Sequence, residues 1–269
     1  MLGALLSASA CGVPSTPPPA LVPTSATRVV PTPRATVAQV FTAAPTLTAT
    51  RVITATPRAT PTVTPTRKEQ PELSAELITA AARGDTTRVL ELIADGAPLN
   101  ARDERGRTAV MAATHGNHVE TVRALLNAGA DVNLRDARSD NPFLYAGAEG
   151  YLEILKLAYA AGADPQLTNR FGGTALIPAC ERGHVEVVRY LLNETTMNVN
   201  HVNNLGWTCL LEAIILSDGG ARHQEIVKMV IEHGADVNLA DKDGVTPLEH
   251  AKRSGFREIQ ALLEAVGAR

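Results

Sequence analysis

The feature that most constrains the fold is a repeat of about 33 residues that begins near Leu73 and continues to the end of the chain. A polar residue opens successive copies, with spacings of 33, 33, 34 and 38 residues, at Asp103, Asp136, Asn169, Asn203 and Asp241. The dipeptide Gly-Ala recurs near the end of several copies, at Gly96-Ala97, Gly129-Ala130, Gly162-Ala163 and Gly234-Ala235. A unit this short cannot bury an apolar face by itself, so neighbouring copies must stack to share one core.

Each copy carries the signals of a turn followed by two helices. In Asp241–Leu248 a glycine suits the left-handed turn position, and Thr246 followed by proline suits the start of a helix. A break at glycine, as at Gly183, precedes a second helix with apolar residues three or four positions apart. These motifs resemble the ankyrin repeats over residues 73–269. The resemblance implies an all-α solenoid of about six helix-turn-helix units with β-hairpin tips.

The repeat boundaries give a division of the chain. Residues 72–269 are expected to form one repeat domain, with an N-terminal cap at 72–102, internal units at 103–135, 136–168, 169–202 and 203–240, and a C-terminal cap at 241–269. The fourth internal unit is longer than the others because of about five extra residues near Ser217–Ala221, whose composition is that of a flexible loop.

The segment before the repeats, residues 12–71, has a different composition. It is rich in threonine and holds 12 of the 17 prolines, and no acidic residue precedes Glu69. Frequent proline opposes helix and strand, and the segment has no periodic apolar face. The composition therefore predicts a disordered Thr/Pro-rich spacer.

Residues 1–11 resemble the signal segment of bacterial lipoprotein precursors. A short apolar run ends in small residues directly before Cys11, as in the cleavage box after which the cysteine is lipidated. Ala8 stands where leucine is usual, and no basic residue precedes Arg28; a true start upstream of Met1 would supply one. The resemblance implies a lipoprotein anchored to a membrane outside the cytoplasm, at the cell surface or in the periplasm. The alternative is a cytoplasmic protein with a chance cysteine.

The resemblance to ankyrin repeats also implies a binding surface for another protein, on the hairpin tips and the concave face of the first helices. Arginine and tryptophan are enriched in binding hot spots, and both occur at these positions. The candidate partner-binding residues are Arg105, Arg107, Arg138, Arg170, Phe171, Glu181, Arg182, Leu205 and Trp207. The structural alternative is that the arginines are solvated and that Trp207 packs on the neighbouring hairpin.

Several function classes are not expected. From Glu69 onward the chain has 19 basic and 28 acidic residues, so it lacks the positive field that nucleic acids require. Catalytic and nucleotide-binding motifs are absent, and the seven histidines are scattered, so we expect no enzyme, cofactor or metal site. The sequence predicts a monomer that binds one protein. The alternative, an accessory or glycan-binding module for a cell-envelope enzyme, would require stacked exposed aromatic residues.

Two cysteines lie within the repeats. On the repeat template Cys180 and Cys209 are five positions apart along helices of adjacent copies. Their Cα atoms should then be further apart than the roughly 7 Å that a disulfide allows. The sequence predicts two buried, free and inert thiols.

Overall fold

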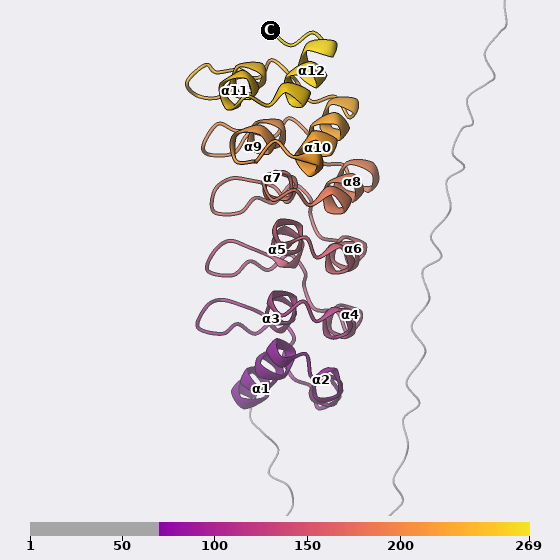
Figure 1. Ribbon diagram of the computed structural model, residues 1–269. Coiled ribbons are helices and arrows are strands. Elements are labelled where there is room, and N and C mark those ends of the chain that lie inside the picture. Colours follow the sequence, from indigo (N-terminus) through magenta and orange to yellow (C-terminus); the bar gives the residue numbers. More distant parts are fainter. Residues whose placement is uncertain (1–69) are drawn as a thin grey trace, which may run out of the picture. The chain divides into compact units, whose positions relative to one another are not determined.

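The computed structural model describes residues 70–269. The predictions for the N-terminal segment and for spacer residues 12–69, including lipidation of Cys11, lie outside these residues. Gln70 and Pro71, which were assigned to the spacer, instead begin the first helix. The described residues form twelve helices in six consecutive pairs (Figure 1): α1 (Gln70–Arg83) and α2 (Thr86–Ala94), α3 (Ala109–His115) and α4 (Val119–Asn127), α5 (Pro142–Glu149) and α6 (Leu152–Ala160), α7 (Leu176–Glu181) and α8 (Val185–Glu194), α9 (Cys209–Ile215) and α10 (Ala221–Glu232), and α11 (Pro247–Ser254) and α12 (Arg257–Ala265).

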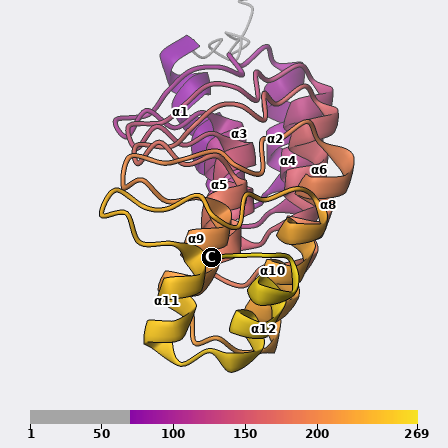
Figure 2. The same ribbon diagram turned by 90° about the horizontal axis from the view of Figure 1, so that it is seen from above.

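The pairs stack along one axis in two layers. The odd-numbered helices form one layer beside a row of projecting loops, and the even-numbered helices form the other (Figures 1 and 2). The described residues contain no strand, so the expected all-α solenoid is confirmed. No helix among them is both long and apolar enough to cross a membrane.

The residue that opens each copy holds the projecting loop in shape. Asp103 Oδ1 accepts hydrogen bonds from the backbone nitrogens of Arg105 and Arg107, at 2.9 and 2.8 Å, and its own nitrogen donates to the oxygen of Arg107. The same pattern recurs at Asp136, Asn169, Asn203 and Asp241. The repeated polar residue is therefore the fixed point of a tight hairpin turn.

A column of alanines runs through the core. It occupies one position of five successive copies, and every member is fully buried: Ala113, Ala146, Ala179, Ala213 and Ala251. Larger side chains, such as Phe143 and Leu210, belong to the same buried cluster. The small residue lets the first helices of adjacent copies approach closely.

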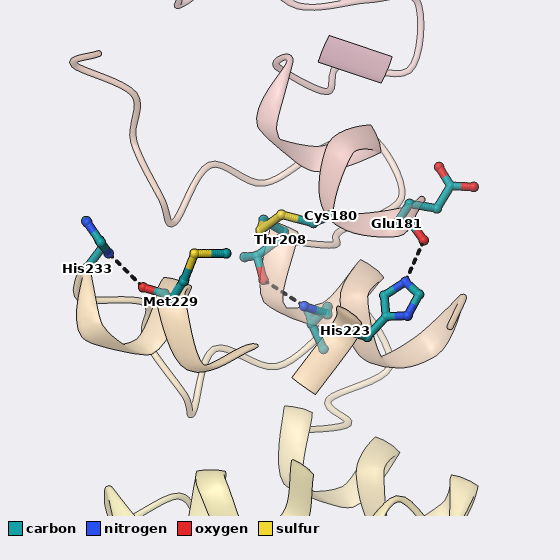
Figure 3. The surroundings of a disulfide bond; sticks show 8 residues. Cys180, Glu181, Thr208, His223, Met229 and His233 are labelled. Carbon is teal, nitrogen blue, oxygen red and sulfur yellow. Dashed lines mark hydrogen bonds between the residues drawn. A yellow bond between two sulfur atoms is a disulfide. The ribbon is translucent and has the colours of Figure 1, made fainter. Parts of the chain in front are cut away.

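The prediction of two free thiols is wrong. Cys180 and Cys209 form a disulfide with a Cα–Cα distance of 5.5 Å (Figure 3). The first helices of adjacent copies are offset, so the end of one lies against the start of the next. Gly147 and Ala175 hold the same two positions one copy earlier, and a Cβ on Gly147 would lie 2.8 Å from the Cβ of Ala175. Positions that are distant on the template are therefore neighbours in space.

The extra residues of the fourth internal unit are more ordered than their composition suggests. Ala221 is already the first residue of α10, so the loop is shorter than expected. Asp218 Oδ1 accepts from the nitrogen of Gly220 at 2.8 Å, and Gln224 Nε2 donates to the oxygen of Gly219 at 2.8 Å. Gly219 also lies against the ring of Phe256. The hydrogen bonds hold the loop in shape and on α10, and the contact with Phe256 places it against the last helix pair.

Candidate partner-binding groove

A groove of about 320 Å³ lies between three successive loops and the helices α5, α7 and α9. We call it the central groove. Its lining residues are Arg138, Asp140, Tyr145, Ala148, Glu149, Asn169, Arg170, Phe171, Gly173, Ile177, Pro178, Glu181, Arg182, Asn203, Leu205, Glu212 and Leu216.

The central groove brings together most of the residues predicted from the sequence. Those in its lining are Arg138, Arg170, Phe171, Glu181, Arg182 and Leu205. Arg105 and Arg107 instead line a second hollow of about 460 Å³. His115 and Arg138 also line this second hollow. Trp207 is half-buried and belongs to neither lining. Its role in partner binding stays a prediction.

Two apolar side chains stand exposed on adjacent loops of the central groove. Phe171 is 52% exposed and Leu205 is 51% exposed. The guanidinium carbon of Arg170 lies 4.4 Å from the centre of the Phe171 ring, as in a cation–π contact. Because the protein leaves these two apolar side chains exposed, the rim of the groove is suited to contact a partner.

The arginines of the predicted set differ in how they are held. Arg182 Nη1 donates to Glu149 Oε1 at 2.7 Å and to the oxygen of Ala148 at 2.9 Å, and Arg107 pairs with Asp103. Within residues 70–269, Arg105 and Arg138 form no ion pair. Their charges are therefore available to a partner.

The second hollow holds a histidine with an unsatisfied nitrogen. His115 Nε2 is buried without a hydrogen-bond partner, 3.8 Å from Asp136 Oδ2, and the ring packs on Tyr145 with 4.1 Å between centroids. Burial, and then the charge of Arg107, lower the pKa of His115. A neutral imidazole avoids electrostatic repulsion by the arginines that line this hollow.

Glu212 on the floor of the central groove was not predicted as a site residue. The side chain is only 6% exposed, and its Oε1 accepts a hydrogen bond from Asn203 Nδ2 at 2.7 Å. Burial, followed by the nearby charge of Glu181, raises the pKa of Glu212 to about 7 from the ordinary 4.5.

A signal in the sequence could have found Glu212. It lies nine positions after the residue that opens its copy, directly before the invariant alanine. The corresponding residues of the other copies are Ala112, Tyr145, Pro178 and His250. In the last copy His250 bonds to its own opening residue, Asp241, at 2.7 Å. The opening residue and this variable position are therefore in contact in both copies, and their chemistry is matched: amide with carboxylate, carboxylate with imidazole.

No cluster of three or more potential metal ligands occurs within the described part of the chain.

Comparison with known proteins agrees with this architecture. The family model for ankyrin repeats (3 copies) matches residues 77–169 and 143–241. The putative ankyrin repeat protein YahD of Escherichia coli K12 is 45% identical over 196 residues, which cover 73% of this chain and 98% of that protein. The crystal structure of an ankyrin repeat domain from Acinetobacter baumannii AYE is 53% identical, with a TM-score of 0.70, and covers 72% of this chain and 98% of its own. The ankyrin repeat domain of human ASB11 is 29% identical, with a TM-score of 0.62, over 72% of this chain and 84% of its own. The chain therefore belongs to the ankyrin repeat family.

Proposed function

We propose that this chain is a non-enzymatic scaffold that binds one partner protein in the central groove. Ankyrin repeats generally mediate protein–protein interactions. The observation that carries the proposal is the exposed pair Phe171 and Leu205 on adjacent loops, with the unpaired Arg138 beside them. Apolar contact supplies affinity, while the arginine directs the approach of an acidic group.

A glycan-binding role is less well supported. Tyr145 packs on His115 and Trp207 is half-buried outside the groove, so that of these aromatic residues and Phe171 only Phe171 is largely exposed. A stacked sugar ring needs a broader aromatic platform than one phenylalanine that an arginine already covers.

The double substitution Phe171→Ala with Leu205→Ala should weaken partner binding by about 2 kcal/mol, or roughly thirtyfold, mainly through faster dissociation. The two side chains are exposed in the free protein, so their loss should leave the fold intact. Partners found by crosslinking on the intact chain would be measured by surface plasmon resonance. Leu90→Ala is the matched control, because Leu90 is equally exposed, at 52%, but lies on α2. Equal losses in both variants would contradict binding in the groove.

We further propose that the protein is held outside the cytoplasm by a lipid on Cys11. The Cys180–Cys209 disulfide supports this, because such bonds persist in oxidising compartments and are rare in the cytosol. The apolar run that ends at Cys11 supports it independently.

Replacing the acceptor of the lipid tests this location. Cys11→Ser should move the protein from the membrane pellet to the soluble fraction, because a lipid is the only anchor proposed. Cell fractionation and the intact mass of the mature protein measure the change. Native protein that is soluble, or that retains Met1, would contradict lipidation.

A further inference from the structure

The floor of the central groove holds a carboxyl group that no cation of the described residues pairs with. Glu212 is more than nine-tenths buried, yet its hydrogen bond comes from Asn203, a neutral amide. Its second oxygen has no hydrogen-bond partner within residues 70–269, and it is not fully shielded from solvent. A carboxylate buried to this extent without a cation destabilises the folded protein, since most of its hydration is lost and not replaced.

The groups around Glu212 add to this cost. Glu181 of α7 contributes a second negative charge to the same groove. His223 bonds to the backbone oxygen of Glu181 at 3.0 Å and not to its carboxylate, which extends away from His223 (Figure 3). Both carboxylates line the groove, and neither forms an ion pair within residues 70–269.

No arginine of the groove forms an ion pair with Glu212. Arg182 is bonded to Glu149, Arg170 lies over the ring of Phe171, and Arg138 lines the groove without an ion pair. On the other helices packed against α9, His223 of α10 lies 3.3 Å from Asp218, and His250 of α11 is bonded to Asp241. No cation of the described chain therefore compensates Glu212.

We propose that the central groove receives the side chain of a lysine or arginine from an extended segment of the partner, with Glu212 and Glu181 as its acceptors. This inference rests on the proposed function. Phe171 and Leu205 can cover the apolar stem of such a side chain while its head reaches the floor. A hollow of about 320 Å³ is at the small end of ligand sites, which suits one long side chain.

Binding of a basic side chain should be coupled to the release of a proton. Because the pKa of Glu212 is raised to about 7, the carboxyl group is mostly protonated at pH 6. A bound cation favours the ionised form, so affinity should increase about tenfold from pH 6 to pH 8. In Glu212→Gln this dependence of affinity on pH should disappear.

The experiment selects peptides from a phage library of random dodecamers on the purified full-length protein at pH 8. The enriched peptides are synthesised, and their affinities are measured by fluorescence anisotropy. We expect a shared arginine or lysine whose replacement by citrulline or norleucine weakens binding at least tenfold. The Glu212→Gln protein should bind the unmodified peptide as weakly as the native protein binds the peptide with citrulline or norleucine. In the Glu212→Gln protein, replacing the basic residue of the peptide should change the affinity less than twofold. Glu186→Gln, an exposed carboxylate on α8, is the matched control and should bind as the unmodified protein does.

Two results would overturn the inference, and they differ in what else they imply. Peptides that depend on Phe171 and Leu205, but bind Glu212→Gln and Glu186→Gln equally well, would refute the basic side chain and leave the groove as a binding site. Peptides that are insensitive to Phe171, Leu205 and Glu212 alike, or a selection that enriches none, would refute the proposed function as well.

Discussion

Reduction of the Cys180–Cys209 disulfide should lower the free energy of unfolding by about 3–4 kcal/mol. The bond joins residues 29 positions apart, and both cysteines are fully buried between α7 and α9. It restricts the unfolded chain, and it ties the first helix of one copy to that of the next. Because a solenoid is stabilised chiefly by contacts between neighbouring copies, the disulfide should strengthen the coupling between these two copies.

Urea denaturation followed by circular dichroism, with and without a phosphine reductant, measures the effect. The variant Cys180→Ala with Cys209→Ala is the control, since its unfolding curve should not respond to the reductant. A native protein whose midpoint is the same in both conditions would contradict a stabilising bond.

Much of the fold could be predicted because it is encoded locally. The opening residues, such as Asp103 and Asn203, hold their loops by bonds to nitrogens two and four positions later. Helix starts were similarly visible, since Thr108 and Thr246 accept hydrogen bonds from nitrogens three residues on. These interactions depend only on neighbours in sequence, and the 33-residue repeat shows them several times.

The contacts between copies could not be predicted in the same way. The disulfide was missed because the offset of α7 against α9 is a property of packing, which the spacing of residues along one copy does not contain. Phe171 and Leu205 were found because exposed loop tips can be identified from the template. Glu212 was missed because its partner Asn203 lies nine residues earlier on a loop, and the two residues meet only in the folded protein.

Glu212→Gln should increase the free energy of unfolding by about 2–3 kcal/mol at pH 8 and leave it nearly unchanged at pH 4. The pKa of Glu212 rises from 4.5 to about 7 on folding, so the folded state holds its proton more tightly than the unfolded state. Below pH 4.5 both states are protonated, and the carboxyl group has no ionisation cost. As the pH rises from 4.5 through 7, the unfolded state ionises first, and stability is lost. Glutamine does not ionise, and its amide oxygen can still accept from Asn203 Nδ2.

Thermal or urea unfolding of both proteins between pH 4 and pH 8 measures this difference, with Glu186→Gln as the control on an exposed helix face. Equal stability at pH 8, or the same gain at pH 4, would contradict a buried carboxylate with a raised pKa. The result also bears on the partner. A residue whose replacement stabilises the free protein, and at the same time abolishes selection for a basic side chain, does not serve the fold. The destabilising charge would then be explained by the complex, in which a cation of the partner compensates it.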